Sequence, residues 1–145
     1  MYKIYLKKDI SSELLLKEIL KEYNLDEEIL LNSYGKPYIK SNKIYFNISK
    51  SKPYTVCVIS DKNIGIDFEK ITLKPRVIKK VCTKEEQKQI KTATDFTIMW
   101  TKKESYVKYL GMGLSYGLIN VDTTQIKKYK ILKIKDYYLT IYQGE

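Results

Sequence analysis

The sequence predicts an α+β protein in which small antiparallel sheets pack on helices. Three observations favour this class. The chain has 145 residues, which suits a single domain with its own hydrophobic core. In several short segments apolar and polar residues alternate, which is typical of strands with one buried face. In other segments apolar residues recur every three or four positions, which is typical of helices.

The first half of the chain is predicted to consist mostly of strands. A helix is expected from Ser11 to about Tyr23, where leucine and isoleucine recur at helical spacing. A loop is expected at 34–37, which contains glycine and proline. Strands are expected at 2–7, 43–49, 54–59 and 64–70, with apolar and polar residues alternating at 43–49 and 64–70, and a short apolar run lies at 29–31. Short turns join the last three strands, so we expect a three-stranded meander.

The second half is predicted to begin with helices and end with strands. Apolar residues at helical spacing mark a segment around 77–81, and Thr83 and Glu86 form a capping-box pattern that begins the next helix. A longer helix is expected from residue 94 or 95 to Leu110, ended by Gly111. Strands are predicted at 119–121, 130–134 and 138–142, the last two as a hairpin around 135–136.

Composition limits the kinds of protein this can be. Hydrophobic residues make up 43% and charged residues 30% of the chain, which describes a soluble globular protein. The apolar runs are too short for a membrane-spanning helix, and the first residues lack the apolar core of a signal peptide. Cys57 and Cys82 match no zinc or redox spacing. We therefore expect a reduced, cytoplasmic protein without a membrane partner.

Charge and the lack of histidine narrow the chemistry. The chain has 27 basic and 17 acidic residues, a net charge of +10, which predicts an anionic partner. It contains no histidine, so a Ser-His-Asp or Cys-His mechanism is excluded. An acid–base step would have to use a carboxylate, lysine, tyrosine, cysteine or metal-bound water.

The segment Ile64–Lys70 contains the first candidate site. In a strand its apolar residues face one side, and Gly65, Asp67 and Glu69 face the other. Acidic residues are depleted in strands, so two of them on one face are unusual. The two backbone positions lie about 6–7 Å apart, which suits a hard divalent cation. Taken alone, the segment is explained more simply by an edge strand with one apolar and one solvated face.

The long helix contains the second candidate site. Phe96, Trp100, Glu104, Val107 and Gly111 form one stripe, which we expect to face inward with both aromatic rings in the core. A glutamate in an apolar stripe requires a partner, because an unpaired buried charge is costly. Lys108, one turn further along, would be such a partner as an ordinary ion pair. A cation shared with the acidic strand would be another.

Together these carboxylates suggest magnesium-assisted chemistry on a phosphate. One possibility is a metal-dependent nuclease, in which Asp67, Glu69 and Glu104 hold Mg²⁺ at a phosphodiester and the basic charge binds DNA. Another is a basic binding module without catalysis, whose carboxylates are merely solvated.

Five motifs in order resemble a known family, the 4′-phosphopantetheinyl transferases of the surfactin-synthetase-activating type. They cover roughly residues 35–115, and their order and spacing make the resemblance specific. They are Gly35-Lys36-Pro37, Phe46-Asn47-Ile48-Ser49, Ile64-Gly65-Ile66-Asp67-Phe68-Glu69, Trp100-Thr101-Lys102-Lys103-Glu104-Ser105-Tyr106-Val107-Lys108 and Gly111-x-Gly113-Leu114-Ser115.

The resemblance implies an activity and its site residues. The enzyme would move the phosphopantetheine arm of coenzyme A onto a serine of an acyl- or peptidyl-carrier protein, an acidic partner that suits the +10 charge. Asp67, Glu69 and Glu104 would hold Mg²⁺, and Glu104 would also deprotonate the serine. Lys108 would bind the phosphate under attack, while Lys36 and Ser49 would contact the nucleotide phosphates. Nucleic acid is then not an expected partner.

The chain also departs from the family pattern. Lys50 stands where the family usually has histidine, and a lysine there could still pair with a phosphate. The chain is much shorter than the two-lobed members. We therefore predict one transferase domain, residues 1–145, built as a compact monomer of two unequal, pseudo-dimeric lobes, residues 1–62 and 63–145.

A run of basic residues follows the acidic strand. It is either a solvated helix face or a docking surface for an acidic carrier helix, and the sequence leaves both open. Its members are Lys70, Lys74, Arg76, Lys79, Lys80, Lys84, Lys88 and Lys91.

Overall fold

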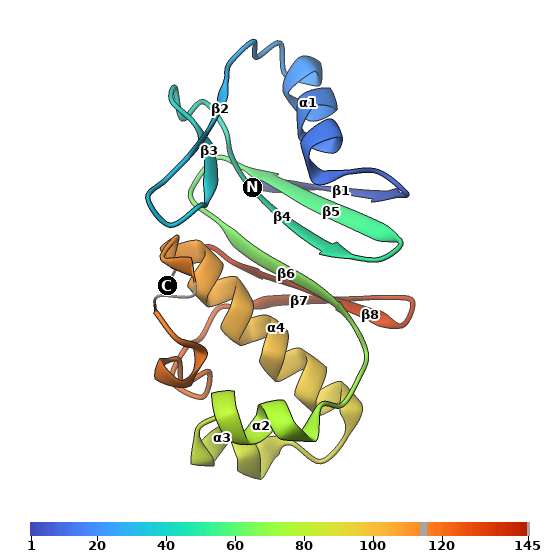
Figure 1. Ribbon diagram of the computed structural model, residues 1–145, viewed down its shortest axis with the longest axis vertical. Helices are drawn as coiled ribbons and strands as arrows, with labels where there is room; N and C mark the ends of the chain where they lie inside the picture. The colour runs from blue at the N-terminus through green and yellow to red at the C-terminus, as the bar shows by residue number, and fades with distance from the viewer. Residues whose placement is uncertain (114–115, 145) are drawn as a thin grey trace.

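Two three-stranded antiparallel sheets form the centre of the protein (Figure 1). The computed structural model describes residues 1–113 and 116–144. The first sheet has the order β1-β5-β4, with bounds Tyr2–Lys8, Tyr54–Ser60 and Tyr45–Ser51. The second has the order β6-β8-β7, with bounds Gly65–Lys70, Tyr137–Tyr142 and Lys130–Ile134. With the helices packed on these sheets, the predicted α+β class is confirmed.

Four α-helices and a small hairpin complete the described structure. The helices are α1 (Ser12–Glu22), α2 (Pro75–Val81), α3 (Lys84–Gln89) and α4 (Ala93–Leu110). The hairpin pairs β2 (Ile29–Leu31) with β3 (Pro37–Ile39). Side chains cap three of the helices at their N-termini, namely Ser11 for α1, Thr83 for α3 and Thr92 for α4. Among the described residues, no helix is long and apolar enough to cross a membrane.

The two faces of strand β5 belong to different cores. Cys57 and Ile59 point toward α1 and pack there with the leucines of that helix. Val56 and Val58 point toward the second sheet, where they meet the apolar face of β6 and β8. On its other side the second sheet is covered by α4, and the hydroxyls of Thr101 and Thr140 are 2.7 Å apart across that contact. The order is therefore α1, first sheet, second sheet, α4, as Figure 1 shows.

The predicted meander of the strands 43–49, 54–59 and 64–70 is wrong. β4 and β5 do form a hairpin, but β6 pairs with β8 in the second sheet. β5 already has β4 on one edge and β1 on the other, so no edge is left for β6. The turn at 61–63 therefore carries the chain from one sheet to the other.

The predicted strand at 119–121 is also wrong, whereas the final hairpin is confirmed. Residues Leu118–Asn120 form a short 3₁₀ helix (η2). The side-chain amide of Asn120 donates a hydrogen bond to the carbonyl oxygen of Tyr116. This local hydrogen bond favours a turn over an extended strand. β7 and β8 pair as expected, and Lys135 adopts a left-handed φ of 56° in their turn.

Gly65 determines how closely α4 can approach β6. A Cβ atom at this position would lie 2.0 Å from the carbonyl oxygen of Ser105 and 2.3 Å from the amide nitrogen of Tyr109. Both atoms belong to the helix backbone, which cannot move aside as a flexible side chain could. Glycine therefore lets the helix rest directly on the strand, and this contact brings Glu104 and Lys108 beside Asp67.

Candidate active site

Four charged side chains meet where β6 faces α4. Asp67 and Glu69 lie on the β6 face that also carries Gly65, and Glu104 and Lys108 are one turn apart on α4. Asp67 is buried at 5% exposure, whereas the other three are half-buried. The structure thus brings together the three predicted metal ligands and the lysine predicted to bind phosphate. Lys108 influences the ionisation of all three carboxyl groups, and the charges of Glu69 and Glu104 influence that of Asp67.

Asp67 is in an unfavourable environment for a charged carboxylate. Burial raises its pKa from 3.8 to about 8; Lys108 opposes this rise, and the charges of Glu69 and Glu104 add to it. Its Oδ1 accepts a hydrogen bond from Ser49 Oγ at 3.1 Å. Its Oδ2 is buried and has no hydrogen-bond partner within the described part of the protein. Buried polar oxygens normally have a hydrogen-bond partner, so this oxygen is available to a bound water or cation.

Burial also disfavours the ionised form of the other two carboxyl groups, Glu69 and Glu104. Burial raises the pKa of Glu104, with Lys108 opposing and Glu69 adding to the rise. Burial also raises the pKa of Glu69, while Lys74 and the side chain of Trp100 act against that rise. A nearby cation would therefore stabilise the ionised form of all three carboxyl groups.

Lys108 is the cation that acts on all three carboxyl groups, and its ammonium already has a hydrogen-bond partner. It donates a hydrogen bond to the carbonyl oxygen of Ile48 on β4, at 2.6 Å. Burial lowers the pKa of Lys108, although the charges of Asp67, Glu104 and Glu69 act to raise it. One ammonium therefore faces three carboxyl groups, so the cluster would carry an excess of negative charge with all three ionised.

The cluster has the donor set of a magnesium site. Three carboxylates, one of them with a buried and unpaired oxygen, match the oxygen ligands that Mg²⁺ prefers. Across residues 1–113 and 116–144, no three His, Cys, Asp or Glu side chains are arranged closely enough to hold a metal as they stand. Side-chain rotation at the half-buried Glu69 and Glu104 would have to complete such a site.

Two of the residues predicted to contact coenzyme A, Ser49 and Lys50, lie on opposite faces of β4. Ser49 points toward β6, and its hydroxyl accepts from the amide of Phe68 at 2.9 Å in addition to donating to Asp67. Lys50, the next residue, lies on the opposite face of the strand and is exposed. The structure therefore does not bring Lys50 into the carboxylate cluster.

Lys36 lies where the β2–β3 hairpin meets the end of α4. Its ammonium donates to Asn63 Oδ1 and to the carbonyl of Ile64, each at 3.0 Å, and to the carbonyl of Tyr109 at 3.5 Å. Burial lowers its pKa to about 8, and the charge of Lys108 adds to that effect. The two lysines thus lie close enough to form one positive region.

A small hollow opens beside these two lysines. It measures about 200 Å³, and its lining includes Lys36, Lys108, Asn47, Ile48 and Gly111. The positive charge of the lysines makes it suitable for a phosphate.

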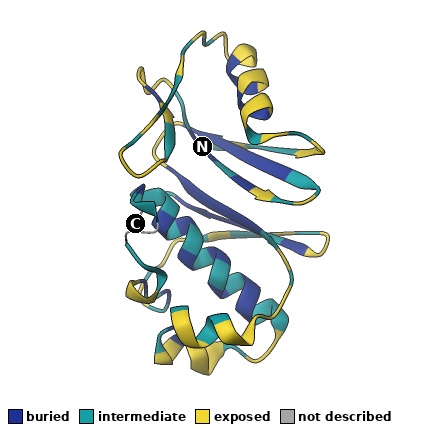
Figure 2. Cartoon of the chain, viewed as in Figure 1, coloured by how far each residue is buried: buried dark blue, intermediate teal, exposed yellow. Residues whose placement is uncertain are grey.

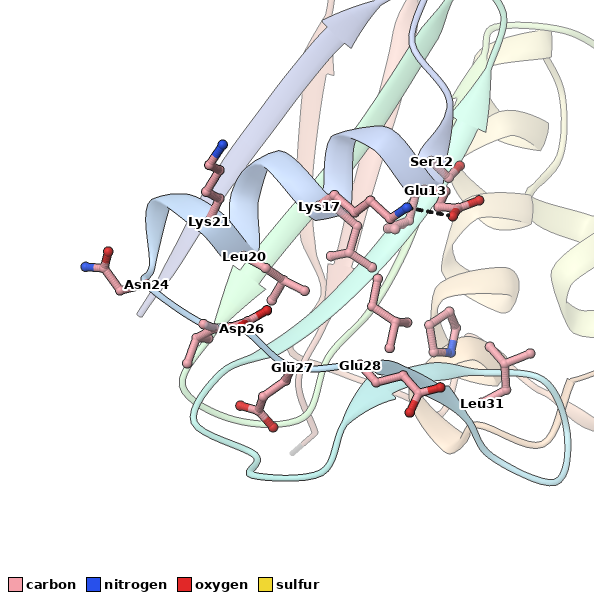
Figure 3. Close-up of a pocket in the computed structure, with 15 residues that line it drawn as sticks. Ser12, Glu13, Lys17, Leu20, Lys21, Asn24, Asp26, Glu27, Glu28 and Leu31 are labelled. Carbon is pink, nitrogen blue, oxygen red and sulfur yellow. Dashed lines mark ion pairs between the residues drawn. The ribbon is translucent and has the colours of Figure 1, made fainter.

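A larger groove of about 1060 Å³ lies between α1 and the β2–β3 hairpin (Figure 3). It shares Pro37 and Ile48 with the small hollow. Its floor is apolar, and its rim carries four acidic residues but only two lysines. These residues are Glu13, Asp26, Glu27, Glu28, Lys17 and Lys21. A phosphate group would therefore prefer the small hollow.

Comparison with known proteins agrees with this geometry. The family model of the 4′-phosphopantetheinyl transferase superfamily matches residues 63–143, which include β6, α4 and all four charged residues of the cluster. The chain belongs to this superfamily.

Two relatives illustrate the match. A 4′-phosphopantetheinyl transferase of Aneurinibacillus migulanus, gsp, is 32% identical over 95% of this chain and 63% of its own length. The transferase Sfp of Bacillus subtilis is 34% identical over 69% of this chain and 50% of its own length. These similarities support the surfactin-synthetase-activating type. The chain spans between half and just under two thirds of the length of these relatives.

Two residues of the predicted motifs lie outside the described part of the chain, and the buried face of α4 differs from the predicted stripe. Leu114 and Ser115 of the fifth motif are not described by the structure. Phe96 lies in the core at 1% exposure, and Trp100 is half-buried and packs against the same cluster. The inward stripe of α4 is rotated, because Lys103 and Ser105, rather than Glu104, are fully buried.

The buried Lys103 reveals an ion pair that was not predicted. Lys103 and Glu86 are 0% and 1% exposed, and the ammonium lies 2.5 Å from Glu86 Oε1. Lys103 also donates to the carbonyl of Val121, and Glu86 Oε2 accepts from both the amide and the hydroxyl of Thr123. The pair joins α3, α4 and the segment after η2. Its only sequence signal is the Thr83–Glu86 capping box, which explains Glu86 without a second partner.

The buried Asp67 predicts an unusual dependence of stability on pH. Between pH 3.8 and about 8, the folded protein retains a proton on Asp67 that the unfolded chain has released. Stability is therefore lost as pH rises through this interval. In metal-free buffer, Asp67→Asn is expected to raise the free energy of unfolding at about pH 9 by about 1–3 kcal/mol and to have little effect at about pH 4. Urea titrations at several pH values would measure this.

The exposed Asp26 provides a matched control for that substitution. Asp26→Asn makes the same chemical change without removing a buried charge, so its effect is expected to be small at every pH. If Asp67→Asn changed stability by the same amount at both ends of the pH range, Asp67 would not be the group that holds the proton.

Proposed function

We propose that this chain transfers the 4′-phosphopantetheine group of coenzyme A to a serine of an acyl- or peptidyl-carrier protein, with Mg²⁺ as cofactor. The observation that carries this proposal is the cluster of Asp67, Glu69, Glu104 and Lys108 where β6 meets α4. It combines an anionic metal-ligand set with a cation suited to a phosphate, in a chain of this superfamily.

The residues of the cluster divide the chemistry between them. Asp67, Glu69 and Glu104 would hold Mg²⁺, which supplies positive charge to the pyrophosphate of coenzyme A. Glu104 would accept the proton of the carrier serine, directly or through a water, because its raised pKa makes it a stronger base than an ordinary glutamate. The serine oxygen then bonds to the phosphorus next to pantetheine, and the bond to the adenosine-bearing phosphate breaks.

Lys108 would stabilise the phosphate that is attacked. Its ammonium lies between β4 and the carboxylates, so it can offer positive charge to the phosphoryl oxygens as charge develops on them. The adjoining small hollow, with Lys36 on its wall, would take a further phosphate of coenzyme A. This assignment keeps the anionic part of the substrate away from the acidic rim of the larger groove.

The basic residues that follow β6 would receive the acidic carrier. Helices α2 and α3 are largely exposed (Figure 2), and their lysines continue the positive surface that starts at Lys70 and Lys74. Lys74 is close enough to the cluster to oppose the rise in the pKa of Glu69, and its ammonium lies 5.9 Å from the centre of the Trp100 ring. A carrier docked here would approach the carboxylates from the α2 side, with its charge complementary to the surface.

Intact mass spectrometry of an apo carrier protein tests the proposal. After incubation with this protein, coenzyme A and Mg²⁺, the carrier is expected to gain the mass of one phosphopantetheine group. Chelation of Mg²⁺ should abolish the gain, and so should Asp67→Ala, because the substitution removes a metal ligand.

The same preparation should be incubated with double-stranded and single-stranded DNA in Mg²⁺. No gain of mass on several acyl and peptidyl carriers, combined with DNA cleavage that requires Asp67, would replace the transferase by a metal-dependent nuclease. No reaction of either kind would favour a binding module.

A further inference from the structure

Strand β6 is an edge strand whose free side is closed by side chains rather than by another strand. Within residues 1–113 and 116–144, its one neighbour in the sheet is β8. On the other side, the amide of Ile66 donates to Asn47 Oδ1 at 2.8 Å, and the amide of Phe68 donates to Ser49 Oγ at 2.9 Å. Both acceptors come from β4 and are less than 8% exposed. Asn47 and Ser49 thus supply the hydrogen-bond acceptors that the backbone of a partner strand would normally offer to the amides of β6.

The direction of the Ser49 hydrogen bonds is determined by this arrangement. Because Ser49 Oγ accepts from the amide of Phe68, its own hydrogen is available to a second group. That group is Asp67 Oδ1, 3.1 Å away. The hydroxyl therefore holds one oxygen of the Asp67 carboxylate, and the amide that it accepts from belongs to the residue directly after Asp67.

This contact leaves the other oxygen of Asp67 with a fixed orientation. Oδ2 is buried and unpaired among the residues that the structure describes, so it is the oxygen available to a ligand. If the Asp67 side chain could rotate freely, the two oxygens would be interchangeable, and each ligand would have to order the carboxylate first. The contact with Ser49 removes this freedom before a ligand arrives.

We propose that Ser49 is a positioning residue, which holds Asp67 Oδ1 so that Oδ2 is presented to the divalent cation. This inference rests on the proposed function, because it takes Asp67 as a metal ligand. It assigns Ser49 a different role from the contact with a nucleotide phosphate that the sequence motif implies. The hydroxyl is already used by Phe68 and Asp67, and it is turned toward β6 rather than toward the small hollow, whose lining includes the neighbouring Asn47 and Ile48.

Removing a hydrogen bond to a metal ligand commonly weakens metal affinity by about 10–100-fold. We therefore expect Ser49→Ala to bind Mn²⁺ about 10–100-fold more weakly than the natural protein, with and without coenzyme A. Electron paramagnetic resonance of free Mn²⁺ would measure the affinity. The dissociation constant of coenzyme A in metal-free buffer should be unchanged, and Ser49→Thr, which keeps a hydroxyl, should restore most of the Mn²⁺ affinity.

Two further variants keep the experiment decisive. Ser49→Cys has nearly the same size but a much weaker donor, so its Mn²⁺ affinity should fall even if Ser49→Ala does not fold. Ser51→Ala changes a serine two positions further along the same face of β4 and should bind Mn²⁺ normally.

The possible outcomes separate this inference from the proposed function. A loss of coenzyme A affinity in Ser49→Ala with unchanged Mn²⁺ affinity would make Ser49 a phosphate contact and overturn the inference alone. Equal Mn²⁺ binding by the natural protein and by Asp67→Asn would remove Asp67 from the metal site, and the positioning role of Ser49 with it. Transfer to the carrier with normal Mn²⁺ binding in all Ser49 variants would leave the function intact and reject the inference.

Discussion

Replacing Lys103 with methionine is expected to lower the free energy of unfolding by about 3–5 kcal/mol, a large part of the stability of a domain of this size. The substitution keeps most of the side-chain volume but leaves the carboxylate of Glu86 buried without its cation. The carbonyl of Val121 loses a donor as well. Chemical denaturation followed by far-ultraviolet circular dichroism would measure the change.

The surface of α3 offers a control of the same chemical type. Lys88 and Glu85 also form an ion pair, at 2.9 Å, but both side chains are more than half exposed. Lys88→Met should therefore change stability very little, since water replaces the lost partner. The double variant Lys103→Met with Glu86→Leu should recover part of the loss, because no charge remains buried. A loss as small as that of Lys88→Met would mean that Glu86 is not ionised in the folded protein.

The pH dependence of this ion pair differs in sign from that of Asp67. Burial raises the pKa of Glu86, but hydrogen bonds from Lys103, Thr123 and Thr83 outweigh it and lower the pKa overall. The pair therefore stabilises the protein above the ordinary pKa of glutamate, and this stabilisation is lost as pH falls through the lowered value. Asp67 destabilises the protein as pH rises toward about 8. Together they predict greatest stability of the metal-free protein in mildly acidic buffer.

Local patterns predicted most elements but not how the sheets are assembled. The strand pattern located β1, β4, β5 and β6, because the period of two determines which residues of a strand share a face, even for β5, whose two faces lie in different cores. The partner of β6 could not be predicted in this way. It depends on β1, some fifty residues earlier, already occupying the second edge of β5. The turn at 61–63 looks the same whether it closes a hairpin or crosses between sheets.

The candidate site shows the same limit at the level of single residues. The motif spacing located Asp67, Glu69, Glu104 and Lys108, because a strand and a helix each present residues at a regular interval. Their meeting depends on Gly65, which the strand pattern places on the same face as the carboxylates without indicating that a helix packs against it. The role of Ser49 could not be read from the chain, because the amide of Phe68 that directs its hydroxyl belongs to another sheet.

Replacing Glu104 with glutamine is expected to lower the rate of transfer to the carrier by about 10²–10⁴-fold while leaving the fold intact. Glutamine has the same shape but cannot accept the proton of the serine. Because burial raises the pKa of Glu104, the ionised glutamate is itself unfavourable in the folded metal-free protein. The variant should therefore melt at the same temperature as the natural protein or higher. Carrier mass as a function of time would give the rate, and thermal unfolding would give the stability.

The pH profile of the natural protein distinguishes loss of a base from loss of a metal ligand. If Glu104 accepts the proton, transfer should decline as pH falls through a pKa higher than that of an ordinary glutamate. In Glu104→Gln the residual rate should lose this decline, even when Mn²⁺ is raised until binding is saturated. Recovery of the full rate at saturating Mn²⁺ would show that Glu104 serves only to hold the metal. Glu18→Gln on the exposed face of α1, away from the proposed carrier surface, is the matched control and should transfer at the natural rate.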